Sequence, residues 1–112
     1  MTPTPYTAVT VFRFTDQETY DEAITAISEL AKMVHEKEPY TTHYAFFPVK
    51  DDKESSFKLV AFEQWISEQA FHDHQATEHV QEIMKKFGPW LENAKVTMDM
   101  NVTGQAALGR QE

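Results

Sequence analysis

Cysteine is absent from the 112-residue chain, and glycine occurs only three times. Without cysteine there are no disulfides, thiolate zinc sites, iron–sulfur clusters or cysteine nucleophiles. None of the glycines opens a helix after a predicted strand, so the chain lacks the Gly-rich loops that hold phosphates in NAD-, FAD- and ATP-binding proteins. A Gly-x-Ser-x-Gly elbow is missing as well. We therefore expect neither nucleotide cofactors nor nucleophilic catalysis.

Basic residues are also few, because ten Lys and Arg face eighteen Asp and Glu, for a formal net charge of -8. Nucleic acids and anionic membrane surfaces both require clustered Lys and Arg. No apolar run approaches the roughly 20 residues of a transmembrane helix. Residues 1–5 lack the basic and apolar regions of a signal peptide. We expect a soluble cytoplasmic protein with no nucleic-acid or membrane partner.

Hydrophobic periodicity predicts four strands. They are expected where β-branched and aromatic residues alternate, at residues 6–14, 41–49, 57–66 and 95–102. Each strand carries apolar groups on both faces, which is typical of a sheet that is covered on both sides.

Helices are predicted between these strands. A long amphipathic helix begins at the S/T-x-x-E capping box that starts at Thr15, and it stops at about residue 37, before Pro39. Ser67 is expected to cap a short helix that runs to about residue 72. A further helix follows Thr77 and is expected to bend or fray near Pro89.

The resulting order is β-α-β-β-α-β. With right-handed crossovers this order gives a ferredoxin-like α+β fold, one antiparallel sheet with its helices on one face. The uncovered apolar face of the sheet then predicts a homodimer, a dimeric α/β barrel, because a second copy is the simplest cover for it. An intramolecular loop or a ligand is the alternative cover. We expect one domain over residues 1–103 and a mobile tail at residues 104–112, which show no periodicity.

One set of residues is distinctive as a combination. It consists of a tyrosine on the second strand, a third strand that ends in Glu-x-Trp, and a following Ser, Ala-x-x-x-His and Thr-x-His, namely Tyr44, Glu63, Trp65, Ser67, Ala70, His74, Thr77 and His79. This set resembles the antibiotic biosynthesis monooxygenase-like family of the dimeric α/β barrel superfamily. The chain departs from the family in having Pro39-Tyr40 where glycine is frequent before the second strand.

The resemblance implies a homodimer with one pocket per subunit between helices and sheet. Family members include oxygenases that act on hydroquinones or anthrone-type polyketides without metal or flavin, haem-degrading enzymes and isomerases. It follows that the chain is expected to be a cofactor-independent monooxygenase of secondary metabolism, with a phenolic, quinol or anthrone-type polyketide substrate and molecular oxygen as partners. A non-redox cyclase, isomerase or decarboxylase, and a small-molecule binding protein without turnover, are the alternatives.

Three residues are predicted to be catalytic. His74 is the candidate base, because imidazole moves protons near neutral pH. Trp65 and Tyr44 would hold the aromatic ring and donate hydrogen bonds to a developing oxyanion. The structural alternatives are a histidine that fixes a helix–strand junction and a core tryptophan. His43 and Tyr44 point to opposite faces of their strand, so only one of them enters a given pocket.

Five further residues are predicted to bind substrate, and each has a structural alternative. His79 would orient a substrate oxygen or pack at a helix start, and a buried Glu63 would either form an ion pair or take up a proton. The aromatic members of the set equally suit the filling of a small core: Phe46, Phe62 and Phe87. No metal site is expected, because His72, His74 and His79 lack the i, i+4 spacing of helical metal ligands. Haem would need one of these histidines as axial ligand, and nothing in the sequence requires it.

Overall fold

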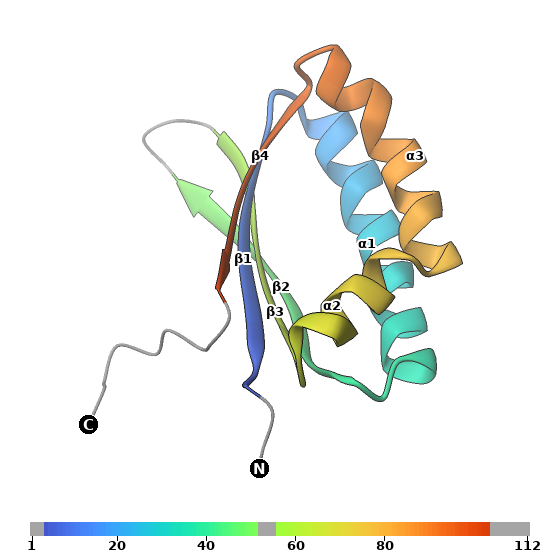
Figure 1. Cartoon of the computed structure of the whole chain (residues 1–112). Coiled ribbons are helices and arrows are strands. Elements are labelled where there is room, and N and C mark those ends of the chain that lie inside the picture. Colours follow the sequence, from blue (N-terminus) through green and yellow to red (C-terminus); the bar gives the residue numbers. More distant parts are fainter. Residues whose placement is uncertain (1–3, 52–55, 104–112) are drawn as a thin grey trace, which may run out of the picture.

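The computed structural model describes residues 4–51 and 56–103. The elements follow the predicted order, with the two expected helices between the third and fourth strands (Figure 1): β1 (Tyr6–Phe14), α1 (Gln17–Lys37), β2 (Thr41–Asp51), β3 (Ser56–Trp65), α2 (Glu68–Gln75), α3 (Glu78–Glu92) and β4 (Val96–Thr103). All strand pairs are antiparallel and the strand order is β2-β3-β1-β4. This is the ferredoxin-like α+β fold that the sequence predicted. The predicted mobile tail at residues 104–112 lies outside the described residues.

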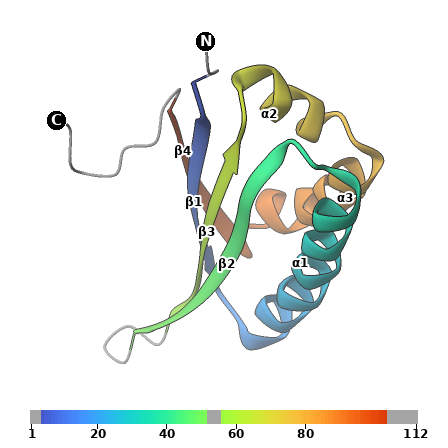
Figure 2. The ribbon, with the colours of Figure 1, turned by 90° about the horizontal axis from the view of Figure 1, so that it is seen from below.

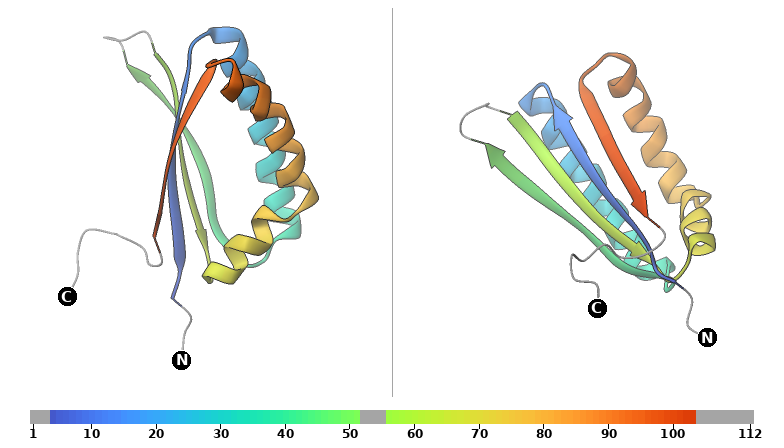
Figure 3. Two further views of the ribbon diagram at one scale, coloured as in Figure 1. Left: turned by 45° about the horizontal axis from the view of Figure 1, so that its top comes forward. Right: turned by 60° about the vertical axis from the view of Figure 1, so that its left-hand side comes forward.

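The molecule has two layers, a sheet and a layer of helices. All three helices lie on the same face of the sheet (Figures 1 and 3). Seen from below, the sheet curves around α1 and α3, with α2 lying across the end where β3 terminates (Figure 2). None of the described helices is long and apolar enough to cross a membrane.

The two ends of α1 are fixed by identifiable groups. Asp16 is the N-cap residue, and its Oδ1 accepts a hydrogen bond from the Thr19 N–H at 2.7 Å. The N-cap was expected at Thr15 and lies one residue later. In a capping box the Thr15 N–H would bond to the Glu18 side chain, but it donates instead to the carbonyl of Lys95 at 3.0 Å. At the other end the Glu38 N–H bonds to the Val34 carbonyl at 2.9 Å, and the helix stops before proline as predicted.

The short helix α2 is longer than expected and therefore includes His74. The Ser67 hydroxyl accepts from the Ala70 N–H at 3.1 Å and begins the helix, as predicted. Thr77 caps α3 and its hydroxyl also donates to the carbonyl of His74 at 2.7 Å, which joins the two helices. The last turn of α2 is thus held by the cap of α3.

Helix α3 continues through Pro89 instead of ending there. Pro89 has no N–H to give to the preceding turn, and Lys85, four residues earlier, is exposed, so water can satisfy its carbonyl. The carbonyl of Pro89 in turn accepts from the Asn93 N–H at 3.0 Å and closes the last turn. Leu91 is consequently carried on the helix.

The main core lies between the sheet and the helices. Its sheet residues alternate along β1 and β3 with the period of two that a strand requires. The buried members are Phe12, Phe14, Ala23, Ile27, Leu59, Ala61, Phe87 and Val96. A smaller cluster near the end of β3 contains Ala8, Trp65 and Ala70.

The opposite face of the sheet carries apolar side chains that this chain leaves partly exposed. Val9 projects from β1, and Phe47 and Val49 project from β2, with Phe47 53% exposed. Phe62 of β3 lies between them, paired with Val9 on one side and with Ala45 on the other. The right-hand view of Figure 3 shows this face with no helix over it.

Candidate active site

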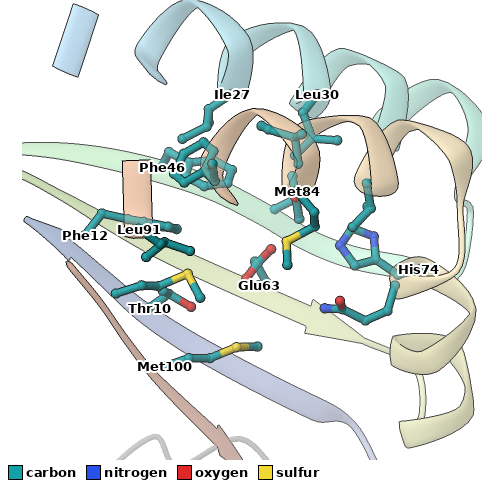
Figure 4. Close-up of a pocket in the computed structure, with 16 residues that line it drawn as sticks. Thr10, Phe12, Ile27, Leu30, Phe46, Glu63, His74, Met84, Leu91 and Met100 are labelled. Atoms are coloured by element: carbon teal, nitrogen blue, oxygen red, sulfur yellow. The ribbon is translucent and has the colours of Figure 1, made fainter. Parts of the chain in front are cut away.

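A cavity of about 140 Å³ lies between the helices and the sheet (Figure 4). Its wall is mainly apolar, with side chains from all three helices and all four strands: Thr10, Phe12, Ile27, Leu30, Tyr44, Phe46, Glu63, His74, Gln75, Val80, Ile83, Met84, Phe87, Leu91, Met98 and Met100. Met84, Leu91 and Met98 are among the exposed large hydrophobic residues, so the cavity opens between α3 and β4. Among the described residues that line this apolar space, three have ionisable or phenolic side chains.

His74 is the first of them. It occupies the last turn of α2 and is only 2% exposed. Its ring lies 5.3 Å from the ring of Tyr44 and 5.1 Å from that of Trp65, measured between centroids. Burial lowers the pKa of His74, although the Glu38 carboxylate acts in the opposite direction. The imidazole is therefore neutral at pH 7.

Glu38 fixes the orientation of that imidazole. Its Oε1 lies 2.7 Å from Nδ1 of His74 and 3.0 Å from the hydroxyl of Thr41, and its Oε2 is hydrogen-bonded to Nε2 of His79. The side chain of Glu38 is 1% exposed. A neutral His74 donates its Nδ1 proton to this carboxylate, so the lone pair of Nε2 is left available on the cavity side.

Glu63 and Tyr44 are the other two groups. Glu63 projects from β3 into the cavity, as Figure 4 shows, and it is buried. Burial raises the pKa of Glu63 to about 7, an effect that the Tyr44 hydroxyl partly offsets by hydrogen bonding and that the charge of Glu38 adds to. Burial also raises the pKa of Tyr44 well above 10, so its hydroxyl keeps its proton. The cavity thus holds a carboxyl group that exchanges its proton near neutral pH.

The sequence of residues 5–86 matches the antibiotic biosynthesis monooxygenase family. The chain belongs to this family. No curated protein matches the chain. Solved structures with the same fold do match it, and three of them are compared with it here.

The three structures cover nearly the whole chain. The protein PA3566 of Pseudomonas aeruginosa has a TM-score of 0.74 at 17% identity, over 96% of this chain and 99% of its own. SnoaB, a cofactor-independent oxygenase from Streptomyces nogalater, has a TM-score of 0.68 at 15% identity, over 95% and 98%. A dimeric ferredoxin-like protein of unknown function from Thermobifida fusca has a TM-score of 0.70 at 15% identity, over 91% and 92%. Likeness at these identities shows a shared fold.

In this member of the monooxygenase family, five of the residues proposed from sequence line one cavity. They come from β2, β3, α2 and α3, and they are Tyr44, Phe46, Glu63, His74 and Phe87. The parity argument for His43 and Tyr44 holds, since Tyr44 is buried and His43 is exposed.

The other three proposed residues lie elsewhere. Trp65 is fully buried behind His74, its ring 4.9 Å from that of Phe71, and it is not among the residues that line the cavity. His79 lines a separate groove between α1 and α3. Phe62 projects from the opposite face of the sheet, its ring 5.9 Å from that of His43. The expectation that Phe62 shares a pocket with His74 is therefore corrected, because its strand parity is opposite to that of Glu63.

Sequence reasoning missed Glu38 and the methionines of the cavity mouth. Glu38 lies at a helix end before a proline, a position at which glutamate is usually exposed. A usable signal was present, because two histidines on nearby helices imply a buried partner for at least one of them. Among the described residues no group of three or more His, Asp or Glu side chains is arranged to hold a metal ion.

Proposed function

We propose that the protein is a cofactor-independent monooxygenase that acts on a phenolic, quinol or anthrone-type substrate. The observation that carries the proposal is the orientation of His74. Its neutral ring is held by Glu38 at Nδ1 and lines an apolar cavity that also contains Glu63 and Tyr44. An oriented neutral imidazole in apolar surroundings is suited to remove the proton from an aromatic hydroxyl group.

The proposed reaction begins with that proton transfer to Nε2 of His74. The resulting phenolate is electron-rich enough to pass an electron to molecular oxygen, and the two radicals combine as a peroxide on the ring. Loss of water from the peroxide leaves a quinone-type product, so one oxygen atom enters the substrate and the other leaves as water. The electrons come from the substrate. Protonated Glu63 is placed to give a proton to the departing oxygen, and the Tyr44 hydroxyl is placed to donate a hydrogen bond.

The same proposal includes a homodimer. It is supported by the partly exposed apolar face that contains Val9, Phe47 and Val49, and by the dimeric state named for the structurally similar Thermobifida fusca protein. A second copy placed on this face would bury it and complete a barrel. The cavity lies on the helix side of the sheet, so each subunit keeps its own site.

A non-redox isomerase, cyclase or decarboxylase is the second candidate. The observation that favours it is the presence of two acid–base groups in one cavity. His74 is neutral at pH 7 and Glu63 has a pKa of about 7, so one can accept a proton while the other returns a proton to a different atom. Molecular oxygen is not needed for such a transfer.

The test is oxygen uptake by the purified protein, treated with a chelator, on a panel of hydroquinones, naphthols and anthrones. Uptake above the spontaneous rate that is lost on boiling supports the oxygenase. Equal substrate consumption under nitrogen contradicts it and selects the second candidate. No consumption of any compound in either atmosphere contradicts both activities for this substrate class.

A further inference from the structure

The hydrogen bonds of Glu38 connect two separate openings of the molecule. On one side, His74 lines the apolar cavity between helices and sheet. On the other side, His79 lines a groove between α1 and α3. The groove is open to solvent, because the charged residues that line it, Glu29, Glu82 and Lys86, are exposed.

The connection between the two openings is a continuous chain of buried hydrogen bonds. Nδ1 of His74 is hydrogen-bonded to Oε1 of Glu38, and Oε2 of the same carboxylate is hydrogen-bonded to Nε2 of His79. The side chains of the three residues are 2%, 1% and 9% exposed. The ionisable or phenolic groups of neighbouring elements that interact with Glu38 are Tyr40, Tyr44 and Glu63.

Each histidine keeps one ring nitrogen outside these bonds. Within the described part of the chain, Nε1 of Trp65 is the only fully buried side-chain nitrogen or oxygen atom without a hydrogen-bond partner. Nε2 of His74 and Nδ1 of His79 form no hydrogen bond with described residues, so both must touch open space. For His74 that space is the cavity, and for His79 it is the groove.

We propose that Glu38 and His79 form a proton relay through which a proton is released from His79 to the solvent of the groove when His74 accepts one in the cavity, so that the buried ring of His74 stays neutral. The proposal rests on the proposed function only in taking the substrate hydroxyl as the source of the proton. A proton enters at Nε2 of His74 while the proton on Nδ1 passes to Oε1 of Glu38. The proton shared by Oε2 of Glu38 and Nε2 of His79 moves onto His79, and one proton leaves from Nδ1 of His79 to water. The cluster holds the same number of protons before and after, with one proton now on Nε2 of His74 and one on Oε1 of Glu38. When Nε2 of His74 later gives its proton to the peroxide oxygen, each proton moves back by one position and His79 takes one up from water, which restores the starting state.

The position of His74 explains why a relay is needed. Its ring is nearly inaccessible and faces an apolar wall, in which a charged imidazole is poorly solvated. Without the relay, His74 would be a buried imidazolium until its proton returned to the peroxide oxygen, and this charge would disfavour the deprotonation of the substrate. The cavity mouth is lined by Met84, Leu91 and Met98, which offer no acid–base group, whereas the Glu38 side leads through one carboxylate to water.

The test needs no substrate, so it is independent of the proposed activity. In the free protein with ¹⁵N-labelled histidine, exchange of the His74 ring N–H with water is measured by saturation transfer. The relay predicts that this proton exchanges faster than the slowest backbone amides of α1, because no opening of the fold is needed. Exchange no faster than those amides overturns the relay.

The matched variants are His79→Gln and His72→Gln. Glutamine at position 79 can still donate to Glu38 but cannot pass a proton on, so exchange at His74 should slow by about 10²-fold, the low end of what a positioned acid–base group contributes. His72 is exposed on α2, and its replacement should leave the rate unchanged. Unchanged exchange in His79→Gln overturns the proposal. If that variant does not fold, Glu38→Gln interrupts the same path and should slow the exchange as well. The exchange rate of the His74 ring N–H relative to the α1 amides in the wild-type protein also tests the relay without any variant.

A kinetic readout follows once a turnover substrate is known. The rate lost in His79→Gln should return on addition of imidazole, which can reach the groove and accept the proton there. Imidazole should not restore His74→Gln, whose missing group is buried. If His79→Gln turns over slowly and imidazole does not restore its rate, the relay is contradicted. If no compound is turned over, the proton-exchange measurement decides by itself.

Discussion

Nδ1 of His74 lies 2.7 Å from Oε1 of Glu38, although 36 residues separate the two along the chain. The bond joins the C-terminal end of α1 to the last turn of α2, so it is both a structural link and the group that sets the tautomer of the imidazole. A substitution of His74 is therefore expected to lower mainly the reaction rate, and a substitution of Glu38 is expected to lower the free energy of unfolding.

Replacing His74 with alanine should lower the rate of oxygen uptake by about 10²–10⁴, the contribution of a positioned general base. The matched control is His72→Ala, which removes an exposed imidazole from the same helix. Initial rates on the best compound of the hydroquinone panel provide the measurement. A His74→Ala protein that keeps the wild-type rate would remove this residue from the mechanism.

Replacing Glu38 with alanine should destabilise the fold by about 3 kcal/mol, because the buried donors of His74, His79 and Thr41 lose their acceptor. The control is Glu36→Ala, an exposed position two residues earlier, where a change within about 0.5 kcal/mol is expected. Urea denaturation at pH 7 measures both. Equal free energies of unfolding for the two variants would mean that the cluster contributes little to stability.

Replacing Glu63 with glutamine should remove a pH-dependent penalty. The pKa of Glu63 is raised from 4.5 to about 7 in the folded protein, so below pH 4.5 both folded and unfolded states are protonated and no penalty exists. As the pH rises from 4.5 to 7 only the unfolded chain releases its proton, and folding loses about 3 kcal/mol, which stays lost above pH 7.

The measurement is the free energy of unfolding of Glu63→Gln minus that of the wild type. It should increase by about 3 kcal/mol between pH 4.5 and pH 8. Glu22→Gln, which removes an exposed carboxylate from α1, is the control. A difference that does not depend on pH would show that Glu63 is ionised in the folded protein throughout this range.

Replacing Phe47 with aspartate should shift the protein from dimer to monomer. Phe47 is 53% exposed on the helix-free face of the sheet, and a buried carboxylate there would be poorly solvated in a dimer. Sedimentation velocity gives the two masses directly. Thr25→Asp places the same charge on the exposed side of α1 and should leave the mass unchanged. A Phe47→Asp protein that remains dimeric would place the interface elsewhere.

The order of the elements could be predicted from the sequence because each signal is local. Strand alternation, the helix stop before Pro39, the cap Ser67 and the helix start after Thr77 all depend on residues within a few positions of one another, and the structure confirms them. The N-terminus of α1 was wrong by one residue. Thr15 and Asp16 are both good caps, and the choice between them is made by Lys95, 80 residues away.

The candidate site was less predictable because its contacts are long-range. Parity separated Tyr44 from His43 and put Glu63 on the same face as Trp65, and the family resemblance then selected Tyr44. The partnership of Glu38 with two histidines depends instead on how α1, α2 and α3 meet. Phe62 shows the opposite error, since its aromatic character was given more weight than its parity. Trp65 was expected beside the substrate but lies behind His74. Alternation along a strand predicts the face on which a side chain lies, and it does not predict whether that side chain reaches the cavity.

The position of Glu38 at the end of α1 limits changes in the length of that helix. One residue inserted between Val34 and Glu38 would turn the carboxylate by roughly 100° about the helix axis and move it by about 1.5 Å. The side chain of Val34 is buried and its carbonyl accepts the Glu38 N–H. The turn that contains Val34 therefore cannot rotate to bring the carboxylate back to the histidines. An insertion before Gln17 leaves this relationship intact. Loop grafts and circular permutations of this protein should therefore place their junctions at the N-terminal end of α1 and preserve the count of residues at its other end.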